Sequence, residues 1–509
     1  MIEALLGKAW SVLTAYPIHA VWIALLLIGC AWYIFVRQMV TGLPPGPLAI
    51  PIIGNAWLLN GNGKESVQTR LMRIGKKYNG IFTMYIGRYP VIWLSSYKTC
   101  HEGFVASGWD CAGRPPELPV PGLDPSGKGF LNMVHAGINP VECEVRDFVR
   151  HKLKGFGVQI MQNRIIDEIN QMMKELEATE GTPFNPTKII AQTIANITLG
   201  TLLGKRFDYD DAHSHRMIEM FSESVRLLMQ MTLDDAFPIL KLFPRTCRKE
   251  GYTKFRYCTE YLRDIVYKNV EVWNKGFPTN IMDVWMDQNA AVSGDKKETF
   301  DIDRLPMILG PLFVASYDTS TMTLSWIFAV MLHKPEVQKK VQDEIDSAIA
   351  SGDITLEHQA LLPYTESVML EVMRMWPVAP FALPHYTDAD VPVGGYTIPK
   401  GTRVYLHSFA VHYDETVWKD PYEFRPERFI NNGKVHVPDW FVPFSKGRRM
   451  CMGDQIAKKQ VFVIFANVMQ KLTLLPATPE KLPSLDFHTI GFFMLPKPYE
   501  MKIKFRHRS

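Results

Sequence analysis

Hydrophobic residues recur every three to four positions over much of the chain, which is the period of amphipathic helices. The clearest of these stretches predict helices over residues 66–78, 160–176, 186–203, 364–375 and 456–475. Strand-like runs appear at residues 81–87 and 91–95, and the short segment Arg88-Tyr89-Pro90 between them is typical of a hairpin. The pattern therefore predicts a mainly α fold with a small β region.

One apolar run is of a different kind. From Pro17 to Val36 the only strongly polar residue is His19, and aromatic residues lie towards both ends. Twenty helical residues span roughly 30 Å, the hydrocarbon thickness of a bilayer. A cleaved signal peptide is the alternative, but the run is long for one and no small-residue cleavage site follows. We expect residues 1–42 to form a membrane anchor and lead-out, and residues 43–509 to form a single catalytic domain.

Composition and charge narrow the class of protein. The 509 residues are 47% hydrophobic, and the net charge of +4 is too small to argue for nucleic-acid binding. The seven cysteines are scattered, with no C-x-x-C pair and no spacing of a metal finger. Such a set is typical of a protein in a reducing compartment.

The segment Phe444-Ser-Lys-Gly-Arg-Arg-Met-Cys451-Met-Gly453 carries the most specific signal. Cys451 precedes a predicted helix, and the unpaired N–H groups and dipole at a helix N-terminus favour negative charge. We expect this setting to lower the pKa of the thiol and to favour the thiolate, which is a ligand for iron. An inert buried cysteine is the alternative for a lone residue, and the complete ten-residue pattern favours the ligand.

This segment matches F-x-x-G-x-x-x-C-x-G, and the chain resembles the cytochrome P450 family, in particular its microsomal, family-2-like branch. The resemblance implies a haem-thiolate fold in which Cys451 binds the iron of haem b. It also implies that Phe444, Gly453 and Ala315 lie against the haem, and that Arg449 pairs with a propionate. In the same branch Arg146 and His385 hold propionates; Glu142 stands where the branch has a tryptophan.

A second motif, Ala315-Ser316-Tyr317-Asp318-Thr319, resembles the family's oxygen-activating sequence A-G-x-D/E-T. The resemblance implies that Thr319 and Asp318 handle protons beside bound dioxygen. Ser316 departs from the usual glycine. Pro306 and Pro311 precede the motif, so we expect the helix to begin near Pro311 or to be kinked there.

Two further segments resemble the family's ion network and substrate pocket. Glu371 and Arg374 are spaced to share one helix face, and Arg428 of a P-E-R-F segment is expected to join them. An ordinary surface pair is the alternative for two such residues in isolation. The resemblance places the apolar side chains Phe381, Ala382, Leu383, Phe492 and Phe493 around the substrate.

The expected activity is monooxygenation of an apolar substrate such as a steroid, a fatty acid or a xenobiotic. Electrons would come from an NADPH-dependent flavoprotein reductase, with cytochrome b5 as a second candidate partner. An acidic partner would dock on a basic face formed by Arg150, Lys152, Lys154, Lys446, Arg448, Lys458 and Lys459. The expected location is the endoplasmic reticulum membrane, with one membrane pass and a cytosolic catalytic domain. A peroxide-acting isomerase or dehydratase and a non-catalytic haem sensor are the alternatives.

Overall fold

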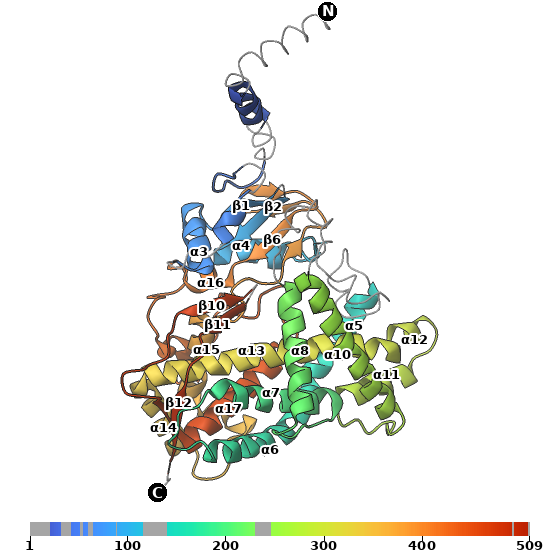
Figure 1. Cartoon of the computed structure of the whole chain (residues 1–509), viewed down its shortest axis with the longest axis vertical. Coiled ribbons are helices and arrows are strands. Elements are labelled where there is room, and N and C mark those ends of the chain that lie inside the picture. Colours follow the sequence, from blue (N-terminus) through green and yellow to red (C-terminus); the bar gives the residue numbers. More distant parts are fainter. Residues whose placement is uncertain are drawn as a thin grey trace, which may run out of the picture.

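Helices make up most of the protein, as the periodicity predicts (Figure 1). The computed structural model describes residues 21–31, 42–50, 54–59, 65–87, 89–115, 140–229, 246–490 and 493–506. The longer helices are α3 (Val67–Lys77), α5 (Pro140–Lys152), α6 (Val158–Glu177), α7 (Pro186–Leu203), α8 (Ala212–Met229), α10 (Thr246–Val270), α11 (Ile281–Ala291), α13 (Leu305–His333), α14 (Pro335–Ala348), α15 (Pro363–Met375) and α17 (Asp454–Lys471). Shorter helical segments are η1 (Ala56–Leu59), α4 (Tyr97–His101), η2 (Glu102–Ala106), η4 (Leu153–Gly157), α12 (Asp295–Thr299), η6 (Ile302–Arg304), η7 (Leu356–Leu361), α16 (Ser408–His412) and η8 (Pro426–Phe429).

The helix α13 runs through the middle of the body and organises the packing around it (Figure 1). It begins at Leu305, so the expectation of a start near Pro311 is wrong. Pro306 lies in the first turn, where the N–H that proline lacks would have no helical partner, and Pro311 is accommodated inside the helix. One end of α13 therefore extends further back than the sequence suggested.

Two apolar cores meet along α13. Its C-terminal half packs with α6, α14, α15 and α17 around the fully buried Trp326. Its N-terminal half packs with α8, α10 and α11 around Trp285 and Phe313. The helix α7 contributes to both cores, with Ile190 in the first and Leu202 in the second, so α7 and α13 run side by side in opposite directions.

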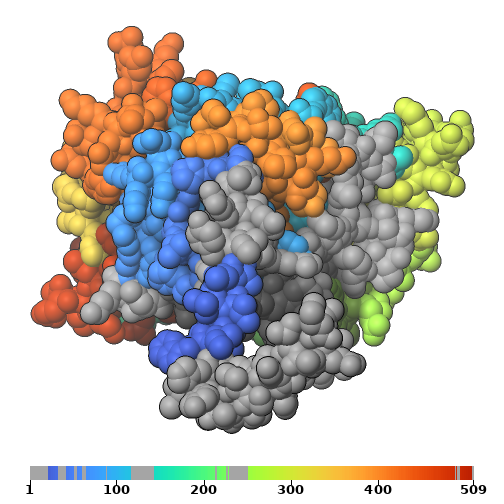
Figure 2. Space-filling model, turned by 90° about the horizontal axis from the view of Figure 1, so that it is seen from above, coloured from blue at the N-terminus to red at the C-terminus, as the bar shows by residue number. Residues whose placement is uncertain are grey.

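The small β region joins segments that are far apart in sequence. A four-stranded sheet has the order β1 (Ile81–Ile86), β2 (Tyr89–Leu94), β6 (Arg403–Leu406) and β3 (His385–Tyr386), and the predicted hairpin is its β1–β2 pair. The strand β6 is parallel to β2 and antiparallel to β3. From above, residues near 90 and residues near 400 share one face of the molecule (Figure 2). Two-stranded sheets pair β4 (Val391–Val393) with β5 (Tyr396–Ile398), β7 (Ile430–Asn431) with β8 (Lys434–Val435), β9 (Leu472–Pro476) with β12 (Met501–Phe505), and β10 (Phe487–Ile490) with β11 (Phe493–Pro496).

The N-terminal region is described in part. Residues 21–31, the middle of the expected anchor, are helical and exposed, and the rest of residues 1–41 lies outside the described residues. Among the described helices, none combines the length and the apolar character needed to cross a membrane. The residues that follow the lead-out are fixed to the body at Thr83, whose hydroxyl donates to the carbonyl of Pro44 at 2.6 Å and whose backbone N–H donates to that of Pro45.

Candidate active site

The loop before α17 holds Cys451 in place. The backbone N–H of Cys451 donates to the carbonyl of Phe444 at 2.9 Å, which closes the loop into a ring. Gly447 lies in the left-handed region at φ +81°, and a Cβ there would come within 1.8 Å of the carbonyl oxygen of Phe104. The glycine is therefore required by close contact between this loop and η2. The helix begins at Asp454, so Cys451 lies just before its N-terminus, as expected.

The Cys451 side chain is exposed, although it lies within the protein and next to the buried Met452. Burial raises the pKa of the Cys451 thiol and outweighs the N–H of Gly453 and the charges of Arg146 and Lys458, which lower it. The expectation of a lowered pKa is therefore wrong for the free thiol, because the surrounding protein disfavours its charged form. The Cys451 sulfur still has exposed surface on which a metal ion could bind. The positive charge of such an ion would stabilise the thiolate that the protein alone disfavours.

Ala315, like Cys451, is exposed although it lies next to buried residues. It follows the buried residues 312–314 in the middle of α13, and Met452 packs in the same core as Phe313 and Val314. The expected contact positions Cys451 and Ala315 thus belong to elements that pack together, and each leaves surface uncovered. Gly453 meets this loop at ordinary distance, since a Cβ there would lie 3.9 Å from the Cys451 Sγ.

Three arginines and a histidine cluster near the same loop. Burial and the charges of Arg449 and Arg146 lower the pKa of Arg114 to about 9, and burial and Arg449 lower the pKa of Arg146 to about 10. Burial, followed by Arg114, lowers the pKa of His385 well below its usual value. Mutually repelling buried cations are costly unless an anion joins them. Two carboxylates, as on a haem, would satisfy this cluster, so the residues present fit the cofactor.

Each member of the cluster is held by a backbone carbonyl. Arg114 Nη1 donates to the carbonyls of Leu383 and Pro384, at 3.1 and 2.8 Å. Arg146 Nη2 donates to Met450 at 2.7 Å, Arg449 Nε donates to Ala112 at 2.8 Å, and His385 Nδ1 lies 2.7 Å from the carbonyl oxygen of Cys111. Arg146, His385 and Arg449 were expected here, but Arg114 was missed.

The sequence signal for Arg114 is weak, because it lies in the composition of its surroundings and not in a motif. Arg114 is followed by Pro115 and Pro116, at the start of the Pro- and Gly-rich stretch 110–140. A cation fixed before such a loop is a reasonable candidate for binding an anion. The side chain of Glu142, the expected departure in α5, lies outside the described residues.

The oxygen-motif residues point in different directions around α13. Thr319 Oγ1 donates to the carbonyl of Ala315 at 2.7 Å, so its oxygen remains available as an acceptor. The buried carboxylate of Asp318 accepts a hydrogen bond from Ser222 of α8. Tyr317 stacks on Phe313 with ring centroids 5.6 Å apart. Asp318 and Thr319 are adjacent in sequence but contact different neighbours.

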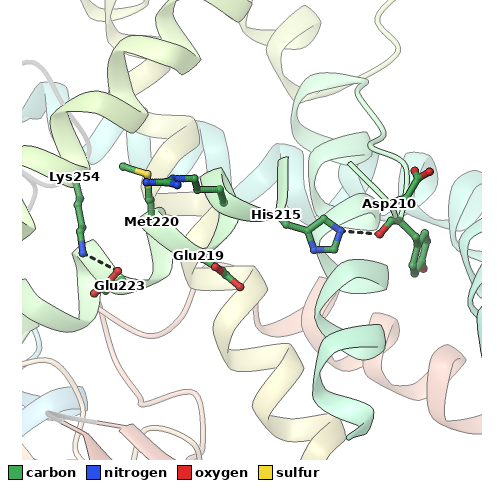
Figure 3. A pocket seen from close by; sticks show the side chains of 8 residues that line it. Asp210, His215, Glu219, Met220, Glu223 and Lys254 are labelled. Carbon is green, nitrogen blue, oxygen red and sulfur yellow. Dashed lines mark hydrogen bonds and ion pairs between the residues drawn. The ribbon is translucent and has the colours of Figure 1, made fainter. Parts of the chain in front are cut away.

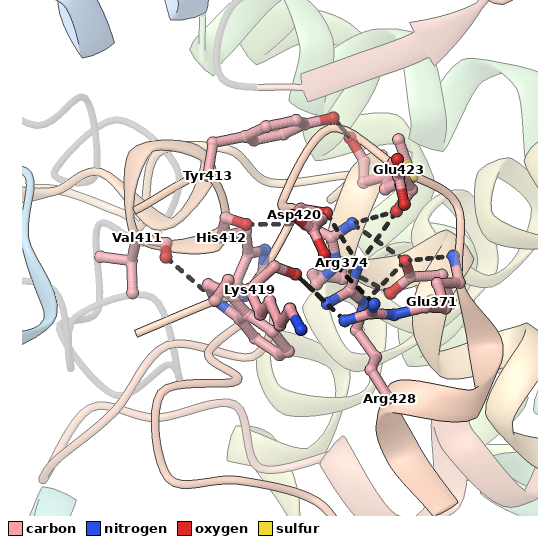
Figure 4. A network of polar contacts seen from close by, with 12 residues as sticks. Glu371, Arg374, Val411, His412, Tyr413, Lys419, Asp420, Glu423 and Arg428 are labelled. Atoms are coloured by element: carbon pink, nitrogen blue, oxygen red, sulfur yellow. Dashed lines mark hydrogen bonds and ion pairs between the residues drawn. The ribbon is translucent and has the colours of Figure 1, made fainter. Parts of the chain in front are cut away.

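The ion network is fully assembled (Figure 4). Arg374 donates to the Glu371 carboxylate through Nε at 2.7 Å and Nη2 at 2.9 Å, and Arg428 Nε donates to it at 3.0 Å. Glu371 and Arg374 are completely buried. Arg374 and Arg428 also donate to loop carbonyls, including that of Glu423. The network therefore ties α15 to the segment that ends in η8.

The expected substrate-pocket residues separate into two groups. Phe381 and Ala382 are buried, and Phe381 packs edge-on against Trp93 at 5.2 Å, in the core of the sheet. Leu383 is exposed and Phe493 is half-buried, while Phe492 lies outside the described residues. Phe381 therefore belongs to the core of the sheet and has almost no surface open to a substrate.

A surface pocket of about 670 Å³ lies elsewhere, between α8, α10 and the residues before α8 (Figure 3). Lys254 in its lining forms an ion pair with Glu223 at 2.7 Å, and His215 contacts the backbone carbonyl of Tyr209. It contains none of the residues expected from sequence, so it is not the candidate active site.

The comparisons with known proteins agree with this arrangement. The family model described as Cytochrome P450 matches residues 44–503. Similar proteins include cytochrome P450 2U1 of Mus musculus, 31% identical over 96% of this chain and 95% of the relative. Cytochrome P450 2F2 of Mus musculus is 31% identical over 91% of this chain and 94% of the relative, and cytochrome P450 18a1 of Drosophila melanogaster is 30% identical over 93% and 89%.

Proposed function

The chain belongs to the cytochrome P450 family of haem-thiolate monooxygenases, and we propose that it inserts one oxygen atom of O2 into an apolar organic substrate. The observation that carries the proposal is the exposure of Cys451 and Ala315 on elements that pack together, with Arg114, Arg146, Arg449 and the neutral His385 near the cysteine loop. A cofactor with one iron and two carboxylates matches both features. The cofactor we propose is haem b.

Haem bound to a cysteine thiolate supplies the redox chemistry that splits dioxygen. The protein supplies positions and protons. Cys451 would hold the iron, and the three arginines together with the neutral His385 would hold the propionates. The Thr319 oxygen, whose own proton is donated to Ala315, acts as an acceptor on the pocket side of α13. The Asp318 carboxylate, steadied by Ser222, is the group that takes up and releases a proton.

The proposed substrate class rests on the candidate pocket residues that are apolar and not fully buried. Ala315, Leu383 and Phe493 offer methyl, isobutyl and phenyl surface, which suits a steroid, a fatty acid or a small xenobiotic. Ser316 and Tyr317, the departures from the family's oxygen motif, are the residues that would favour the peroxide-acting alternative. Ser316 bonds towards α7 and Tyr317 stacks within α13, so neither supports that alternative.

The test combines purified protein, an NADPH-dependent flavoprotein reductase, NADPH and a panel of apolar compounds. We expect compound-dependent NADPH consumption and a product that contains one oxygen atom from labelled O2. Product formation from a peroxide isomer alone, with no NADPH consumed in any case, would contradict the proposal.

The electron donor is proposed to dock beside the cysteine loop, with cytochrome b5 as a competitor for the same face. Arg448 is exposed and stacks on the exposed Trp109, with its guanidinium carbon 3.9 Å from the ring centroid. Lys446 is less available because it lies 3.4 Å from Asp439. Arg448→Glu should raise the KM for the reductase, whereas the exposed control Arg256→Glu on α10 should not. Equal effects of the two variants would contradict this docking site.

We propose that residues 1–42 anchor the protein in the endoplasmic reticulum membrane by one pass, with the catalytic domain in the cytosol. The support is the apolar run from Pro17 to Val36 and the attachment to β1 of the residues that follow the lead-out. Removal of residues 1–41 should leave a haem-loaded protein that no longer sediments with membranes. Loss of haem incorporation on truncation would show that this segment belongs to the catalytic domain.

A further inference from the structure

The hydroxyl of Ser316 on α13 lies 3.1 Å from the hydroxyl of Thr198 on α7, and one of them donates to the other. Thr198 is buried and Ser316 is half-buried, so the bond lies between the two helices. We propose that Thr198 is a positioning residue: through Ser316 it fixes the turn of α13 that presents Thr319. This inference rests on the proposed function, because it assigns a role in the reaction to that turn.

The hydrogen bond between Ser316 and Thr198 lies in the same helical turn of α13 as Thr319. Residues 315 and 319 are joined by the hydrogen bond from the Thr319 hydroxyl to the Ala315 carbonyl, and Ser316 lies between them. Successive residues on a helix are rotated by about 100°, so Ser316 lies to one side of the face that carries the exposed Ala315 and Thr319. A contact at Ser316 therefore restrains the rotation of this turn from its flank.

The partner helix is a rigid support. Residues 192–203 of α7 are almost all buried, and Asn196, two positions before Thr198, is held at both ends of its amide. Its Nδ2 donates to Glu168 and to the carbonyl of Phe207, and its Oδ1 accepts from the backbone N–H of Phe207. The hydroxyl of Thr198 is thus presented from a fixed position.

Other hydroxyls on these two helices behave differently. Those of Thr193 and Thr201 on α7 donate to the carbonyl four residues earlier in the same helix, and that of Thr193 also contacts the Tyr209 hydroxyl in the loop after α7. Those of Thr319, Thr323 and Ser325 on α13 likewise donate to the carbonyl four residues earlier. The contact between Ser316 and Thr198 joins two helices instead, and a cross-helix bond can transmit position where a bond within one helix cannot.

The test compares Thr198→Val, Ser316→Ala and the double variant with Thr201→Val as the matched control. Thr201 is also buried on α7, and its hydroxyl donates to the carbonyl of Ile197 in the same helix. The readouts are the fraction of NADPH electrons recovered in product and the rate at which the reduced, haem-loaded protein is reoxidised by O2. Thermal unfolding of all four variants measures the loss of stability separately.

We expect Thr198→Val and Ser316→Ala each to lower the ratio of product to NADPH by roughly two- to tenfold, the change that one hydrogen bond accounts for. The double variant should match the single variants, and Thr201→Val should keep the parent ratio despite a similar drop in unfolding temperature. Parent-like coupling in Thr198→Val, or effects that add in the double variant, would overturn the proposal. If the parent forms no product, the proposed function fails, and equal reoxidation rates in all variants would then overturn the positioning role independently.

Discussion

Replacement of Glu371 by glutamine removes one charge from the centre of a fully buried network. The carboxylate accepts two hydrogen bonds from Arg374, one from Arg428 Nε and one from the backbone N–H of Arg425 at 2.9 Å. Glutamine has almost the same shape, but its NH2 group would face arginine N–H donors. Arg374, whose side chain has no exposed surface, would remain as a buried cation without its counter-charge.

Breaking a buried pair by removing one partner costs about 3–5 kcal/mol. That corresponds to a loss of roughly 100- to 5,000-fold in the folding equilibrium constant. Because the network ties α15 to the segment before η8, we expect the loss to appear as global destabilisation. Glu371→Asp keeps the charge and should lose less than Glu371→Gln.

The assay is denaturant unfolding of haem-loaded protein, followed by tryptophan fluorescence and by haem absorbance. The matched control is Glu427→Gln in the P-E-R-F segment that carries Arg428, where Glu427 pairs with Lys340 at 3.5 Å on the surface. An exposed pair contributes at most about 1 kcal/mol. If Glu371→Gln yields too little folded protein for an unfolding curve, the yields of haem-loaded Glu371→Gln and Glu371→Asp are compared instead, and Glu371→Asp should give the higher yield. A Glu371→Gln variant as stable as Glu427→Gln would refute the reasoning.

Three further predictions concern the cofactor, the proton path and pH. Arg114→Ala should speed haem loss to a haem-scavenging protein by roughly tenfold or more, since a charge-assisted bond is removed; a rate equal to that of the exposed control Arg73→Ala would contradict this. Thr319→Ala should keep substrate binding but divert electrons to peroxide, measured as peroxide released per NADPH, and an unchanged ratio would remove Thr319 from the proton path. Burial lowers the pKa of His407 to about 3, and neither of its ring nitrogens has a hydrogen-bond partner among the described residues. Below the unfolded-state pKa the unfolded chain binds a proton at this histidine and the folded chain does not, so the free energy of unfolding decreases as the pH is lowered. His407→Phe, in its aromatic surroundings, should therefore gain about 1.6 kcal/mol more at pH 5 than at pH 6.5; equal gains in urea unfolding at both values would contradict this.

The sequence predicted helices best where their ends are chemically marked. The helix α7 was expected over residues 186–203 and has those bounds, because Asn185 caps its start, Pro186 begins it and Gly204 adopts a left-handed conformation after its end. The helix expected over residues 456–475 ends at Lys471 instead. Residues 472–476 form β9, whose partner β12 lies at the far end of the sequence, and local periodicity carries no signal of that pairing.

The candidate site was predictable where a motif fixes local spacing. Cys451, Ala315 and the ion network have such motifs. The missed Arg114 has no regular spacing, and the mutual repulsion that marks it depends on Arg146 and Arg449, which come from other parts of the chain. Phe381 was expected in the pocket because it is apolar, but its ring packs against Trp93 in the core of the sheet. Sequence alone also could not show that Ser316 bonds to α7.

The central claim is that Cys451 binds the haem iron as a thiolate, and the absorbance spectrum of the reduced protein with carbon monoxide tests it most directly. The parent should show the long-wavelength band of a thiolate-bound haem, and Cys143→Ser, a control on α5, should keep it. Cys451→Ser should lose the band while still containing haem, as measured by extraction of the pigment. A parent without the band, or a Cys451→Ser variant that retains it, would contradict the account.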